Sequence, residues 1–173
     1  MDLKKAILEE HSKAQALKIT AYIGSSQKRF DELMTHFFAD DWRLNQCTAY
    51  SMNFVVAEHP HLFKKHLKSA IDNLRQPKHD AVKRNTLKIL ENIEIPEKHL
   101  GHVVDMCFDF LASHDEPVAV KAYSMGILFK VGKKEPDLFH ELKVLIEDQM
   151  PTGTPGFTSR GRKYLKYINE VLG

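Results

Sequence analysis

The sequence predicts an all-α fold in which pairs of helices repeat along the chain. Three observations support this prediction: apolar residues recur at helical spacing through most of the sequence, prolines fall between the periodic stretches, and the tetrapeptide Ala-Tyr-Ser-Met occurs at residues 49–52 and again at 122–125. Proline inside a helix removes a hydrogen bond and clashes with the preceding turn. Its restriction to the junctions therefore favours helices between them.

The helices follow from the apolar spacing. Phe30, Leu33, Met34 and Phe37, for example, recur at intervals of three and four residues and form one apolar stripe. Ser25 or Ser26 is available to cap that helix. We expect helices at residues 2–23 with an interruption near residue 11, and at 26–38, 41–58, 61–75, 79–94, 97–113, 116–133, 136–149 and 155–172.

A repeat emerges when the second helix of each pair is aligned. Ala49, Thr86, Ala122 and, in a weaker copy, Gly161 then occupy the same position, at spacings of 37 (86 − 49), 36 (122 − 86) and 39 (161 − 122) residues. A small residue there lets two helices approach closely. Helix pairs of this length predict an α-solenoid, because each pair needs its neighbours to bury its apolar stripe.

We expect one domain over residues 1–173, with an N-terminal cap at 1–24 and repeats at approximately 26–58, 61–94, 97–133 and 136–172. No apolar run approaches the ~20 residues that cross a bilayer. The N-terminus lacks the pattern of a signal peptide. Cys47 and Cys107 lie singly among apolar neighbours, as in reduced proteins. These features predict a cytoplasmic protein without a membrane partner.

The second helices resemble those of HEAT repeats. The stretch DEPVAVKAYSMGILFKV (115–131) has an acid and a proline at its start, Val118 and Ala122 inside, and Lys121 at the usual basic position. HDAVKRNTLKILENI (79–93) is similar, with Thr86 in place of the usual Ala, and DDWRLNQCTAYSMNFVVAE (40–58) matches less well. The resemblance covers about residues 26–172. It implies a right-handed α-α superhelix, a HEAT/armadillo-like solenoid of about four helix pairs with an N-terminal capping helix, similar to small bacterial HEAT-like proteins.

Two patterns in the sequence partly resemble sites for chemistry. His99 and His102 are spaced i, i+3 on a helix, but they lack the partner residues of known zinc motifs. Gly156 and Gly161 enclose four residues, as in a phosphate-binding loop, but the Gly-Lys-Ser/Thr that should follow is absent. We therefore interpret Thr154 as an N-cap, Pro155 as the first helical residue and Gly161 as a close-packing point. The sequence predicts no catalytic residue, no metal and no cofactor.

Basic residues are concentrated on the second helices. In HEAT-like arrays these helices usually line the concave face, so the resemblance implies a basic concave surface there, with an ordinary solvated face as the alternative. An anion site at the last helix N-terminus, near Arg160, Arg162 and Lys163, also remains open. Lys78 and Lys88 belong to the same helices. The candidate partner-binding residues are Lys83, Arg84, Lys121, Arg160, Arg162 and Lys163.

The leading functional prediction is a non-enzymatic interaction module whose concave face binds a protein partner. The alternative is a nucleic-acid-binding protein related to the HEAT-like DNA glycosylases that remove alkylated bases, which have an acidic residue and aromatics on a basic face. Asp41, Trp42 and Tyr50 would supply those groups here, although we interpret Trp42 as an interhelix packing residue. An enzymatic function would require a deep pocket with convergent polar groups.

Overall fold

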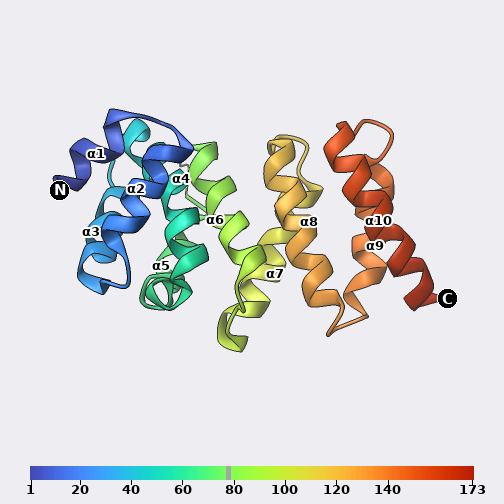
Figure 1. Ribbon diagram of the computed structural model, residues 1–173. Coiled ribbons are helices and arrows are strands. Elements are labelled where there is room, and N and C mark those ends of the chain that lie inside the picture. The colour runs from blue at the N-terminus through green and yellow to red at the C-terminus, as the bar shows by residue number, and fades with distance from the viewer. Residues whose placement is uncertain (77–78) are drawn as a thin grey trace. The chain divides into compact units, whose positions relative to one another are not determined.

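The computed structural model describes residues 1–76 and 79–173 (Figure 1). Pro77 and Lys78, which the sequence places at a junction and among the basic residues, lie outside the described residues. The described residues form helices and no strand, which confirms the all-α prediction. The elements, with η1 a 3₁₀ helix, are α1 (Leu3–Glu9), α2 (Lys13–Ile23), α3 (Gln27–Phe37), α4 (Trp42–Glu58), η1 (Pro60–Lys65), α5 (Leu67–Asn73), α6 (Asp80–Asn92), α7 (Glu97–Ala112), α8 (Val118–Gly132), α9 (Leu138–Gln149) and α10 (Pro155–Leu172).

The chain divides into two compact units, unit 1 at Met1–Ile93 and unit 2 at Glu94–Gly173. The division falls at the junction expected between the second and third repeats. The aligned second helices are α4 and α6 in unit 1 and α8 and α10 in unit 2. Each unit therefore contains one pair of second helices that can be compared with the other pair.

Two of the helices, α3 and α10, begin at short polar side chains that cap them. Ser26 accepts a hydrogen bond from the backbone N–H of Arg29, and Thr154 accepts one from Phe157. These bonds satisfy N–H groups that have no partner within a helix. The caps at Ser26 and Thr154 agree with the sequence predictions, and Pro155 is the first residue of α10 as expected.

Unit 1 is built around α4, which packs against α1, α2, α3 and α6. Phe30, Phe37 and Met52 are fully buried in its core. Asn45 of α4 fixes the turn that precedes its own helix, because its side-chain amide donates to the carbonyl oxygens of Phe37 at 2.9 Å and Ala39 at 2.7 Å. The buried amide thus replaces the hydrogen bonds that these carbonyls would lose at the end of α3.

The single helix expected at residues 61–75 is wrong, since η1 and α5 replace it. In a continuous α-helix the carbonyl of Leu62 would accept from the N–H of His66. Instead, the His66 N–H donates to Phe63 O at 3.0 Å, and the side-chain amide of Gln27 on α3 donates to Leu62 O at 3.2 Å. A partner on another helix therefore takes the carbonyl that would have continued the α-helix.

Unit 2 has its core between α7, α8 and α9, where Cys107, Met125 and Phe139 are fully inaccessible to solvent. Two glycines allow close helix contacts. A Cβ on Gly132 would lie 2.3 Å from the Phe139 ring, and one on Gly161 would lie 2.9 Å from the Met150 sulfur. Gly161 is therefore the close-packing point that the sequence predicted.

Candidate functional site

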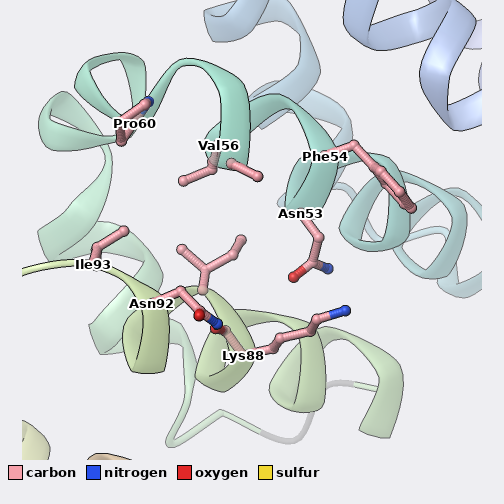
Figure 2. Close-up of a pocket in the computed structure, with 9 residues that line it drawn as sticks. Asn53, Phe54, Val56, Pro60, Lys88, Asn92 and Ile93 are labelled. Carbon is pink, nitrogen blue, oxygen red and sulfur yellow. The ribbon is translucent and has the colours of Figure 1, made fainter. Parts of the chain in front are cut away.

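A groove of about 490 Å³ lies between α4 and α6 in unit 1. Side chains of the two helices face one another across it, with Phe54 at one end and Pro60 and Ile93 at the other (Figure 2). Val56 and Ile89 are almost fully buried and form its apolar floor. The full lining consists of Asn53, Phe54, Val56, Ala57, Pro60, Lys88, Ile89, Asn92 and Ile93.

A chain of amides fixes the orientation of Asn53 at this groove. The Asn85 amide donates to Ala81 O at 2.7 Å, so its own oxygen turns toward Asn53. The Asn53 amide nitrogen donates to that oxygen at 2.7 Å and to Ala49 O at 2.9 Å. Because a primary amide has two N–H donors, both are then used. The Asn53 oxygen is left pointing into the groove (Figure 2).

Lys88 and Asn92 supply the polar rim from α6. The Asn92 amide donates to the carbonyl oxygen of Lys88 at 2.8 Å, one helical turn earlier. Lys88 is exposed, and its ammonium forms no ion pair with any residue in the described part of the chain. Among the described residues that line the groove, Lys88 is also the one titratable side chain. The groove therefore combines an aliphatic floor with one oriented acceptor and one positive charge.

In unit 2, aromatic side chains pack between α8 and α10. Phe129 of α8 stacks on Tyr164 of α10, with ring centroids 3.9 Å apart, and its ring lies edge-on to Tyr167 at 5.3 Å. The Lys133 ammonium lies 4.9 Å from the centroid of the Phe129 ring. Cation–π and stacking contacts of this kind add to the apolar burial.

The structure distributes the six candidate basic residues over both units. Lys83 and Arg84 belong to unit 1, and Lys121, Arg160, Arg162 and Lys163 belong to unit 2. Arg84, Arg162 and Lys163 are exposed, whereas the other three are partly buried. A single contiguous basic surface stays a prediction.

Arg160 is engaged within unit 2. Its guanidinium donates to the carbonyl oxygen of Ala122 at 3.0 Å and lies 5.6 Å from the centroid of the Tyr123 ring. These contacts join α10 to α8. They give Arg160 a structural role in addition to the anion-binding role that its position near a helix N-terminus suggested.

The interpretation of Trp42 as an interhelix packing residue is wrong, because 60% of its surface is exposed. Trp42 is the first residue of α4 and lies ahead of the buried stripe; its ring stacks on His79 with centroids 5.8 Å apart. The Asp41 carboxylate is the N-cap of α4 and accepts the N–H groups of Arg43 and Leu44, each at 3.0 Å.

Both cysteines are buried free thiols, as expected. Burial raises the pKa of Cys107 to about 12 and also raises the pKa of Cys47 above its ordinary value. A thiol must lose its proton to act as a nucleophile. Both sulfurs are therefore held in the unreactive form at neutral pH.

The described residues provide neither a cluster of metal ligands nor a helix that could span a membrane. They contain no group of three or more His, Cys, Asp or Glu side chains arranged to hold a metal ion. Likewise, none of the helices in the described ranges is both long enough and apolar enough to cross a membrane.

A family model described as a HEAT repeat domain matches residues 3–168. The chain belongs to the HEAT repeat domain family. This match confirms the resemblance seen in the second helices and the all-α solenoid class. It also includes α1 and α2, which the sequence pattern had assigned to a cap. Comparisons with curated proteins and with solved structures give no match.

The groove was not predicted from the sequence. In the sequence Lys88 is one basic residue among several on the second helices, and Asn53 and Asn92 are not among the predicted site residues. The available signal was an amide within an otherwise apolar helix, as in SMNFVV (51–56). A polar residue on an apolar helix has to find a partner when it is buried, and here its partner is Asn85 on the next second helix.

Proposed function

We propose that this HEAT repeat protein is a non-enzymatic interaction module that binds a protein partner through the groove between α4 and α6. The observation that carries the proposal is the groove itself, in which an apolar floor is combined with the exposed Lys88 ammonium and the oriented Asn53 oxygen. Helical repeat arrays generally act by offering such extended surfaces.

The lining supports binding better than catalysis. General acid–base chemistry needs at least one group positioned to move a proton, usually with a second group to orient it. The lining offers one exposed lysine and two amides. Apolar grooves between helices are a recurrent docking place for segments of other proteins. The buried free thiols fit a reducing compartment, and we place the interaction in the cytoplasm on that basis.

The experiment is photo-crosslinking from a benzoylphenylalanine at position 57, compared with one at position 21. Ala57 lines the groove, and Ala21 is an exposed alanine on α2. After irradiation in a cell lysate, we expect discrete protease-sensitive adducts from position 57 and none from position 21. The adducts should disappear when Val56→Phe fills the groove. The proposal would be overturned if discrete protein adducts formed equally from both positions. It would also be overturned if neither position gave such adducts.

The exposed Trp42 favours one second candidate function, the binding of nucleic acid. An accessible indole can stack on a base, and Arg84 is an exposed basic residue in the same unit. Binding of this kind should weaken steeply with salt, because phosphate contacts release counterions. A filter-binding titration with duplex and single-stranded DNA tests it, and nuclease-sensitive adducts in the crosslinking experiment would point the same way.

A further inference from the structure

We infer that the groove between α4 and α6 selects an acidic, aliphatic segment of the partner protein. The segment places an aliphatic side chain on Val56 and Ile89, donates a backbone N–H to the Asn53 oxygen, and sets a carboxylate beside Lys88. This inference rests on the proposed function and specifies the chemistry of the bound segment.

The Asn53 oxygen requires a donor. The backbone of α6 fixes the orientation of Asn53 through Asn85. The Asn85 side-chain nitrogen donates to Ala81 O, so the Asn85 side-chain oxygen faces Asn53 and accepts its hydrogen bond. Turning the Asn53 amide over would bring two oxygens together and lose both of its hydrogen bonds. The groove thus presents a fixed acceptor, and a peptide backbone N–H is a donor that every residue except proline carries.

Lys88 determines which charge the bound segment should carry. It is the one charged side chain among the described lining residues, and no described acid pairs with it. A basic segment would be repelled, whereas a carboxylate would gain an ion pair at the edge of an apolar surface. Such partly exposed pairs contribute specificity more than affinity, so reversing the charge should change which segments bind.

The floor of the groove determines which type of side chain the bound segment should place there. Val56 and Ile89 are aliphatic and almost fully buried, so they close the bottom of the groove without a polar group to satisfy. The accessible apolar surface beside them comes from the walls, where Ala57 and Pro60 are exposed. Phe54 lies at one end of the groove and Pro60 at the other (Figure 2). A side chain such as Leu or Ile gains from burial there, whereas a polar one would lose its hydration without compensation.

The first test is selection from a displayed library of random peptides on three proteins: the wild type, Lys88→Glu and Lys18→Glu. Lys18 is an exposed lysine on α2 outside the groove, so the control has the same net charge. Wild type and Lys18→Glu should both enrich Asp or Glu close to Leu, Ile or Val. Lys88→Glu should enrich Lys or Arg instead. An individual acidic peptide should bind Lys88→Glu about tenfold more weakly than it binds Lys18→Glu.

The second test addresses the Asn53 oxygen without changing the protein. The best peptide is synthesised with a single backbone N-methyl group at each position in turn. Removal of the N–H that Asn53 accepts should reduce affinity at least about tenfold at one position, while methylation at exposed positions should change it less. If N-methylation at every position changed the affinity equally little, the Asn53 oxygen would not accept a hydrogen bond from the bound segment, and that part of the inference would be wrong.

The outcomes separate the two proposals. Peptides that bind without acidic residues, or that bind Lys88→Glu and Lys18→Glu equally, overturn the inferred chemistry and leave a protein-binding groove in place. Failure to select any peptide, together with the absence of discrete protein adducts from position 57, overturns the proposed function. Circular dichroism of both variants, which should match the wild type, establishes that a change in selection reflects the groove.

Discussion

The pair α4 and α6 in unit 1 differs from the pair α8 and α10 in unit 2 in what fills the space between the helices. Unit 1 has a groove there, and unit 2 has stacked aromatic rings. The four helices are aligned copies of one repeat, so corresponding positions can be matched by counting from Ala49, Thr86, Ala122 and Gly161. Matching them shows how one scaffold produces two different surfaces.

Three matched positions explain the difference. Seven residues after the small residue, α4 has Val56 and α8 has Phe129; three residues after it, α6 has Ile89 and α10 has Tyr164; six residues after it, α6 has Asn92 and α10 has Tyr167. In unit 1 these side chains line the groove, and in unit 2 they make the aromatic contacts. Side-chain volume at three positions therefore decides whether the space is open or filled.

The two pairs also differ in how their helices are joined. In unit 1 the Asn53–Asn85 amide bond joins α4 to α6. In unit 2 Arg160 on α10 donates to a backbone carbonyl of α8, and aromatic rings of the two helices stack on one another. Hydrogen bonds between side chains hold two helices at a set distance without filling the space beside them, whereas stacked rings occupy it.

The largest predicted effect is in unit 2, where space is tightest. Gly132→Ala should destabilise the protein by about 3 kcal/mol, because its Cβ would enter the buried Phe139 ring. The measurement is urea unfolding followed by circular dichroism. Gly101→Ala is the matched control, since nothing lies within 4 Å of its Cβ on exposed α7 surface. The control should gain up to about 1 kcal/mol from helix propensity.

The next largest effect on stability is expected when the aromatic residue of unit 2 at a matched position is replaced by the smaller residue of unit 1. Phe129→Val should cost about 2 kcal/mol, because the partly buried ring and its stacking on Tyr164 are lost. Val144→Ala on the exposed face of α9 should change stability by less than about 0.5 kcal/mol in the same urea titration. Equal losses in the two variants would show that the aromatic contacts add nothing to unit 2.

Polar contacts should make unit 1 sensitive to acid. Lys65, Gln27 and His66 donate hydrogen bonds to the Asp31 carboxylate and hold its pKa well below the ordinary value. Because the pKa of Asp31 is lower in the folded state, its carboxylate stabilises the folded protein at pH values above its unfolded-state pKa of about 3.9. This stabilisation is lost as the pH falls toward the folded-state pKa. Because the carboxylate side chain is 32% exposed, we expect only about 1 kcal/mol at neutral pH.

Asp31→Asn measures this contribution. Urea unfolding followed by the fluorescence of Trp42, which lies in unit 1, should show a loss of about 1 kcal/mol at pH 7 and a smaller difference from wild type at pH 3. A difference that grows on acidification would contradict the assignment. Asp72→Asn, which breaks only the exposed pair with Lys68, is the control and should change little at either pH.

The smallest effect on stability is expected for the reverse exchange at the same matched position, in which unit 1 receives the aromatic residue of unit 2. Val56→Phe should alter the free energy of unfolding by less than about 1 kcal/mol, because the larger ring can extend into the existing groove. The same variant should abolish crosslinking from position 57. Preserved crosslinking in a well-folded Val56→Phe protein would place the contact surface outside the groove.

The helices were largely predictable because most carry their own apolar spacing and several also have their own cap, as α3 does with Ser26 and its four buried residues. The division of residues 61–75 into η1 and α5 was not. It depends on the capture of the Leu62 carbonyl by Gln27, 35 residues earlier in the chain. Local periodicity contains no information about a hydrogen-bond partner on another helix.

The candidate site was less predictable than the fold. Charge on the second helices directed attention to Arg160, yet its guanidinium binds the backbone of α8. The groove depends on which side chains of α4 face which side chains of α6, and on their volumes. Neither follows from the spacing of apolar residues within one helix. Aligning the repeat copies recovers part of it, because Val56 and Phe129 then stand at one position.

The burial of both cysteines has a practical consequence. Cys47 is 6% exposed and Cys107 is fully inaccessible, with thiols held protonated. Alkylating reagents such as maleimides attack thiolates, so the folded native chain should react slowly with them. A single cysteine introduced at the rim of α4 or α6 could then carry a spectroscopic label, with the natural sulfurs left unaltered.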